Sequence, residues 1–285
     1  IGPQAARGPV PKSMWDDRAV NSLGTDEFVD LCRRPGAEPL IVINTGRFDR
    51  ETPRAAYLQE TLDWMEYCNG PADSPWGAIR ARNGHPDPYR VKLWEIDNET
   101  WEVPVEGYIE IVKEFAPAMR RAHPDVTLLA CGGDSARLDS HGHWDPKLIE
   151  ACADCFDVLS IHHYESPKRF ADGPPVDERW YRDLQALIAK SRNPALKLFV
   201  SEWNAQSTDW RTGLYAGGIL NTFERCGDVV AIASPALFLR HVSARAWDNA
   251  LINFDACGWF PAPNYVVMKL WRDAYAPERI AVDGP

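Results

Sequence analysis

The chain has 285 residues, of which 45% are hydrophobic and 25% are charged, and this composition suits one large domain with a substantial core. Its net charge of −10, with no lysine- or arginine-rich run, argues against nucleic acid as a partner. No apolar stretch reaches the roughly 18 residues of a membrane span, so we expect no membrane partner.

Six short apolar runs, rich in leucine and β-branched residues, predict buried parallel strands. They are nearly continuous rather than alternating, as in strands whose two faces are both covered. The predicted strands are residues 40–44, 91–97, 126–131, 157–162, 196–201 and 229–233.

Helical patterns lie between and around these runs. The predicted helices are residues 25–34, 54–67, 105–122, 145–155, 177–191, 211–225 and 263–274. Pro117 lies inside one of them, where we expect a kink or a break. Residues 69–90 form a predicted long loop, and a loop of that length in a compact domain usually has a function.

This alternation predicts an α/β fold, specifically a TIM (β/α)₈ barrel. Such a barrel needs eight strands, however, and six are visible. Residues 1–23 are rich in proline, glycine and charge and do not resemble strands. Either two short strands escape detection, or the chain is part of a longer protein.

Seven cysteines, an odd number, favour reduced thiols over a disulfide framework. Reduced thiols in turn slightly favour the cytoplasm over an oxidising compartment. Cys152 and Cys155 form a CxxC pair, but no second pair or flanking histidine completes a zinc set. We therefore interpret them as structural, and we expect no metal and no cofactor.

Polar clusters end three of the predicted strands. They are Asp97-Asn98-Glu99, His162-His163-Tyr164 and Ser201-Glu202-Trp203-Asn204. In a barrel, catalytic groups lie at the carboxyl ends of the strands, and carboxylates are costly to bury there without a purpose.

Glu99 and Glu202 lie three strands apart and can face each other across the barrel mouth. Two carboxylates about 5–5.5 Å apart are what retaining glycoside hydrolysis requires, with one protonated as the acid and the other ionised as the nucleophile. Asn98 can bind the sugar hydroxyl beside the anomeric carbon, and Tyr164 can donate to Glu202. Each glutamate could instead cap a helix or pair with an arginine.

Three more residues are candidates for substrate binding. His163, with its neighbour His162, is interpreted as a hydrogen-bonding group at the pocket floor rather than as a metal ligand. Trp203 could stack on a sugar. Asn44 could line the pocket or form a turn.

Four segments together resemble glycoside hydrolase family 51, the α-L-arabinofuranosidase family. They are residues 24–46, 67–99, 160–164 and 200–204. The resemblance implies Glu99 as acid/base, Asn98 as its sugar-binding neighbour, Tyr164 as partner of the nucleophile, and Glu202 as nucleophile. Asp97 departs from the family, which usually has glycine there, and residues 234–255 also differ.

The resemblance also implies that the barrel is partial. The family's first two strands and its C-terminal β-sandwich have no counterpart, so residues 1–275 would supply strands three to eight, with Glu99 on strand four and Glu202 on strand seven. Residues 276–285 would be a tail or the start of a linker.

We therefore expect a retaining hydrolase that releases terminal α-L-arabinofuranosyl residues from plant polysaccharides or oligosaccharides. A homo-oligomer is possible, because family members are often trimers or hexamers. One alternative is an endo-β-1,4-glucanase or xylanase on the same barrel. Another is an inactive barrel fragment that needs a further segment or chain.

Overall fold

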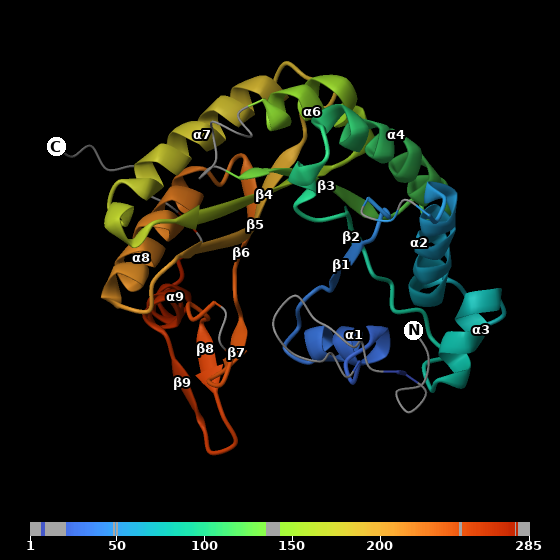
Figure 1. Ribbon diagram of the computed structural model, residues 1–285, viewed down its shortest axis with the longest axis horizontal. Coiled ribbons are helices and arrows are strands. Elements are labelled where there is room, and N and C mark those ends of the chain that lie inside the picture. Colours follow the sequence, from blue (N-terminus) through green and yellow to red (C-terminus); the bar gives the residue numbers. More distant parts are fainter. Residues whose placement is uncertain are drawn as a thin grey trace.

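The computed structural model describes residues 7–8, 21–47, 49, 51–134, 143–244, 247–276 and 278. Its main sheet has six parallel strands in chain order, curled into an arch (Figure 1). The strands are β1 (Leu40–Ile43), β2 (Leu93–Ile96), β3 (Thr127–Asp134), β4 (Val158–Glu165), β5 (Lys197–Ala205) and β6 (Val230–Pro235). All six coincide with predicted strands, which confirms the α/β class.

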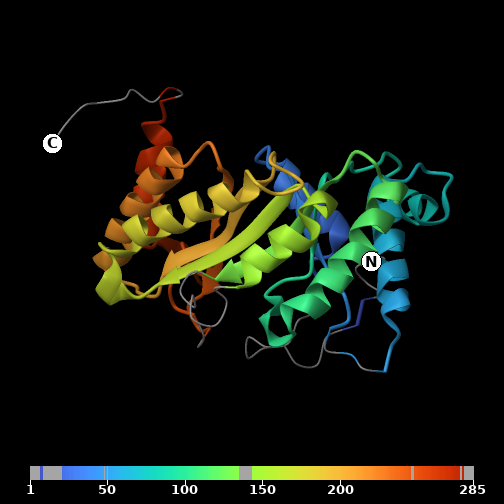
Figure 2. The same ribbon diagram turned by 90° about the horizontal axis from the view of Figure 1, so that it is seen from above.

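Helices cover the convex side of the arch (Figures 1 and 2). They are α2 (Arg54–Asn69), α4 (Val105–Ala122), α6 (Trp144–Cys152), α7 (Gly173–Ile188) and α8 (Trp210–Arg225). Helix α1 (Thr25–Arg33) precedes β1, and α9 (Pro263–Asp273) packs against α8. A curled parallel sheet with helices on its outer side is the arrangement of a partial (β/α) barrel.

The main core lies between the sheet and these helices. Fully buried side chains such as Trp94 of β2, Phe115 of α4 and Tyr181 of α7 belong to it. A smaller cluster, formed by Leu129, Val158 and Phe199, fills the inner face of the sheet. The middle strands are buried on both faces, in keeping with their nearly continuous apolar runs, whereas Val42 of β1 and Ile232 of β6 at the two edges are 39% and 38% exposed.

Part of the predicted loop at 69–90 is helical. Helix α3 (Pro75–Arg82) begins after Ser74, whose Oγ accepts a hydrogen bond from the Gly77 N–H at 3.2 Å. Proline is well suited to the first helical turn, where its missing N–H costs nothing. Glycine is required at position 77, since a Cβ would lie 1.9 Å from the Pro71 carbonyl oxygen.

Pro117 does not break α4, which runs unbroken through it. Its side chain is exposed. On that face, the Lys113 carbonyl that loses its usual partner can accept a hydrogen bond from water. The cost of an interior proline is therefore lower here than in a buried position.

Three short strands that the sequence did not indicate form a second sheet: β7 (Leu239–His241), β8 (Ile252–Phe254) and β9 (Trp259–Pro261). Three 3₁₀ turns complete the described structure: η2 (Thr100–Glu102), η4 (Ala153–Cys155) and η5 (Pro167–Arg169).

All seven cysteines are free thiols, including Cys152 and Cys155. Among the described residues no helix is long and apolar enough to cross a bilayer. The predicted tail at 276–285 lies almost wholly outside the described residues.

Candidate active site

Glu99 lies just beyond the carboxyl end of β2, where the chain turns sharply. Asp97 and Glu99 both have positive φ angles, of 62° and 47°, and η2 follows directly. Tyr108 of α4 braces the strand beneath this turn. Its hydroxyl donates to the Ile96 carbonyl at 2.6 Å and accepts from the Cys131 N–H at 2.7 Å, which ties β2 to β3.

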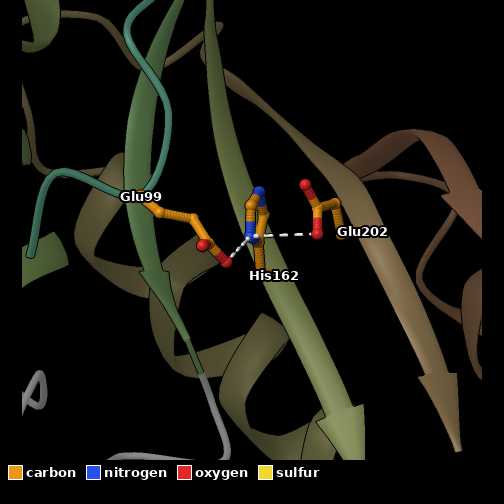
Figure 3. Close-up of side chains that lie close together, drawn as sticks. All are labelled: Glu99, His162 and Glu202. Carbon is orange, nitrogen blue, oxygen red and sulfur yellow. Dashed lines mark hydrogen bonds and ion pairs between the residues drawn. The ribbon is translucent and has the colours of Figure 1, made fainter. Parts of the chain in front are cut away.

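His162 of β4 lies between the two candidate catalytic carboxylates (Figure 3). Its Nδ1 is 3.0 Å from Glu99 Oε1 and 3.7 Å from Glu202 Oε2. One carboxylate oxygen from each glutamate and one ring nitrogen of His162 all lie within 4.8 Å of one another. The sheet therefore brings together Glu99 and Glu202, which are far apart in sequence.

Tyr164 holds the second carboxylate. Its hydroxyl donates to Glu202 Oε2 at 2.6 Å, as the sequence predicts, and its ring meets Trp247 edge-on with centroids 5.0 Å apart. Hydrogen bonds to charged groups are stronger than neutral ones, so this contact fixes the orientation of the Glu202 carboxylate.

The surroundings of His162 favour its protonated form. Burial alone would lower its pKa, but the hydrogen bond to Glu99 and the charges of Glu202, Glu99 and Glu95 outweigh burial and raise the pKa above its ordinary value. A protonated imidazole between two carboxylates offsets their mutual repulsion. Among the residues described, Glu99, His162 and Glu202 are also the group whose ligand atoms lie close enough together to hold a metal ion.

Trp101 completes the side of the site nearest Glu99 and was not predicted from the sequence. Its indole N–H donates to the Gly132 carbonyl at 2.9 Å, and its ring meets His162 edge-on at 5.6 Å between centroids. The available signal was an aromatic residue two positions after Glu99.

His162, rather than His163, reaches the carboxylates, because side chains alternate along a strand. His163 points to the helix side, where its Nε2 lies 2.7 Å from Asp177 Oδ2 of α7. The same alternation, counted back from Tyr164, would have selected His162 from the sequence. The expectation that His163 forms the pocket floor is therefore wrong.

Trp203 also faces away from the site. It is fully buried, with its ring against Tyr215 and Phe223 of α8. Its expected contact with sugar is replaced by packing between sheet and helix.

Asn44 is exposed, and its Oδ1 accepts from the Gly46 N–H at 2.9 Å, so it forms the turn that was the alternative to substrate binding. Asn98 is half-buried beside Glu99.

Glu95 lies on β2 beneath the carboxylate pair and was not predicted from the sequence to belong to the site. It is 2% exposed, and its Oε1 has no hydrogen-bond partner among the described residues. Burial raises its pKa to about 7, against an opposing hydrogen bond from Ser160 and the charge of His162. The carboxyl group is thus largely neutral in mildly acidic solution.

A curled parallel sheet with two facing carboxylates at its carboxyl edge is the arrangement that barrel glycosidases use. The alpha-L-arabinofuranosidase 1 domain matches residues 1–182, and the chain belongs to this family. The resemblance to glycoside hydrolase family 51 is thereby confirmed.

Similar proteins include the extracellular exo-alpha-L-arabinofuranosidase of Streptomyces chartreusis, 30% identical over 96% of this chain and 32% of that protein. The intracellular exo-alpha-(1->5)-L-arabinofuranosidase of Halalkalibacterium halodurans is 28% identical over 72% of this chain and 42% of its own. The alpha-L-arabinofuranosidase of Thermotoga maritima has a TM-score of 0.81 and 26% identity, over 95% of this chain and 56% of its own. The chain thus spans about a third to two fifths of these curated relatives.

Replacing Tyr164 with phenylalanine removes the hydrogen bond to Glu202 and keeps the ring that contacts Trp247. We expect kcat on an aryl arabinofuranoside to fall about 10- to 100-fold, because a hydrogen bond to a charged group contributes roughly 1.5–3 kcal/mol. Tyr89→Phe is the matched control. The Tyr89 hydroxyl also donates to a carboxylate, that of Asp26 at 2.8 Å, but this hydrogen bond lies outside the site. Equal loss in both variants would contradict the assigned role of Tyr164.

Glu95→Gln should change how stability depends on pH. The Glu95 pKa rises on folding from its ordinary 4.5 to about 7, so the folded state binds the extra proton and loses stability as pH rises through this window. The effect is on the order of 3 kcal/mol. Urea denaturation at pH 4 and pH 8 measures the free energy of unfolding of both proteins. Between pH 4 and pH 8, the difference between them should shift in favour of the variant. A pH-independent difference between them would show that Glu95 titrates normally.

Proposed function

We propose that this chain carries the catalytic site of a retaining glycoside hydrolase. The carboxylate pair carries the proposal: oxygens of Glu99 and Glu202 lie within 4.8 Å of each other beside His162. Inverting enzymes separate their two carboxyl groups by about 6.5–9.5 Å, to leave room for a water molecule. The shorter separation suits direct attack by one carboxylate on the sugar.

Glu202 is the nucleophile in this proposal. Tyr164 holds its carboxylate for attack on the anomeric carbon, and the bond from that carbon to the leaving oxygen breaks as Glu99 gives the oxygen a proton. Glu99, now a carboxylate, then takes a proton from water, and the resulting hydroxide displaces Glu202 from the sugar. Asn98, beside Glu99, would hydrogen-bond the neighbouring sugar hydroxyl.

The proposed substrate is a terminal α-L-arabinofuranosyl residue on an oligosaccharide or polysaccharide. The family match and the names of the relatives from Streptomyces chartreusis and Halalkalibacterium halodurans support this choice over an endo-β-1,4-glucanase or xylanase. Release of arabinose alone from arabinan, with no shortening of carboxymethyl cellulose, is the expected product pattern.

We further propose that two more strands close the barrel between β6 and β1, the two edges of the sheet. An apolar hollow of about 480 Å³ beside β1 supports this, since Phe28, Val42 and Trp64 line it and Val42 is 39% exposed. A β-sandwich after the barrel and a homo-oligomer remain predictions.

Two glutamate variants test the chemistry. Glu202→Ala should abolish turnover of every aryl arabinofuranoside. Glu99→Ala should lower kcat/KM, which reports the first step, by about 100-fold or more for substrates with poor leaving groups and far less for good ones. General acid catalysis contributes roughly 10²–10⁴-fold to that step. Added azide should restore Glu202→Ala with inversion of configuration and Glu99→Ala with retention.

Glu106→Gln is the control for these variants. Glu106 is an exposed carboxylate of α4, paired with Lys147 at 2.7 Å, and its loss should leave the rate unchanged. If the parent chain is inactive and regains activity only with a longer segment of the protein, the fragment interpretation is correct. If Glu99→Ala lowers kcat/KM equally for substrates with good and with poor leaving groups, Glu99 is not the acid.

A further inference from the structure

The turn that carries Glu99 is unfavourable for the residues that form it. Asp97 and Glu99 both adopt left-handed backbone angles, although neither is glycine. Each such residue costs roughly 1–2 kcal/mol, so surrounding contacts must hold the turn in place. These angles set the direction in which Asn98 and Glu99 leave β2.

The Asp97 carboxylate makes three contacts that hold the first half of the turn. Its Oδ1 accepts from the Asn98 N–H at 2.8 Å and pairs with Nη1 of Arg47. Its Oδ2 accepts from the Thr45 hydroxyl. Arg47 and Thr45 both lie in the segment after β1, so this carboxylate joins the ends of two adjacent strands.

Arg47 also holds the second half of the turn. Its Nη2 donates to the Glu99 carbonyl oxygen at 3.3 Å. A single guanidinium therefore spans the turn from Asp97 to Glu99, and the side chains of Arg47 and Asp97 are each only 10% exposed. The rigid fork of arginine suits such a bridge, whereas lysine offers one point charge.

The hollow beside Arg47 lies on the side facing α4. It is lined by Val103, Gly107 and Ile111 together with residues 45–47, and by none of the three residues Glu99, His162 and Glu202. Arg47 contacts the turn at the Asp97 carboxylate and the Glu99 carbonyl oxygen, and its Nε lies 4.0 Å from Glu102 Oε2 in η2. Its influence on the site would therefore pass through the backbone of the turn.

Stability alone explains this pair poorly. A buried ion pair often contributes little relative to well-packed apolar residues, because both charges lose their hydration. We propose that Arg47 and Asp97 form a clamp that positions the Glu99 carboxyl group for proton transfer, an inference that rests on the acid/base role proposed for Glu99. Both are positioning residues.

Arg47→Lys tests the clamp because it keeps the charge and removes the fork. We expect kcat/KM to fall about 10- to 100-fold for aryl arabinofuranosides with poor leaving groups and far less for good ones, since misplacing a catalytic group by about 1 Å costs that much. Arg120→Lys is the matched control. Arg120 also bridges an aspartate and a carbonyl, Asp157 at 2.8 Å and Val126 at 3.2 Å, outside the site.

A second readout does not need activity. Because the Glu99 hydrogen bond raises the pKa of His162, a displaced Glu99 should lower that pKa, which NMR titration of the imidazole measures. Arg47→Lys should lower it and Arg120→Lys should not. If neither the parent chain nor a longer segment of the protein hydrolyses an arabinofuranoside, the proposed function fails, and this titration alone decides on the clamp.

Thr45→Val removes one hydrogen bond to Asp97 without changing charge, and serves if Arg47→Lys does not fold. It should give the same leaving-group dependence and pKa change, in weaker form. An equal fall in kcat/KM for substrates with good and with poor leaving groups would overturn the clamp. An unchanged His162 pKa in a folded variant would also overturn it.

Discussion

The contact of one imidazole with two carboxylates is the interaction on which the proposed chemistry depends. Two carboxylates this close repel each other, and the His162 ring lies beside both, at 3.0 Å from Glu99 and 3.7 Å from Glu202. The rest of the fold maintains that geometry. β2, β4 and β5 place the three side chains, and Tyr108, Trp101 and Tyr164 fix the backbone or side chains beside them.

Polarity in the sheet interior increases from its floor to its rim. Leu129, Val158 and Phe199 form the apolar floor. Above them lie Glu95 and the hydroxyls of Ser160 and Ser201, which are 2.5 Å apart. The cluster of Glu99, His162 and Glu202 lies at the carboxyl edge. Because burial raises the pKa of Glu95 to about 7, this carboxyl group adds little negative charge beneath the cluster in mildly acidic solution.

Much of this arrangement could be predicted from the sequence. The six strands are continuous apolar runs, and both glutamates follow such runs, so the strand ends and the carboxylate pair were visible. The outward orientation of Trp203 was predictable too, because alternation from the inward-facing Glu202 turns the next side chain outward. The inward position of Ser201 was not. A register shift between β4 and β5 pairs Ile161 with Val200 but His162 with Glu202, so Ser201 is an extra residue.

That extra residue explains why simple alternation fails on β5. Ser201 and Glu202 both contact inward-facing partners, Ser160 and Tyr164, and Trp203 alone turns outward. Nothing local in the sequence marks a β-bulge. The clamp was equally hidden, because Arg47 and Asp97 are 50 residues apart and meet only through strand pairing.

The chain-order arrangement of parallel strands also determines when the site can form during folding. Glu99 and His162 are 63 residues apart, and Tyr164 and Glu202 are 38 residues apart. Contacts across such separations require large loops to close first, which makes folding slow. During synthesis, Glu99 emerges well before Glu202, so the carboxylate pair cannot exist until β5 joins β4. A chain truncated before Lys197 would retain the proposed acid but lack its nucleophile.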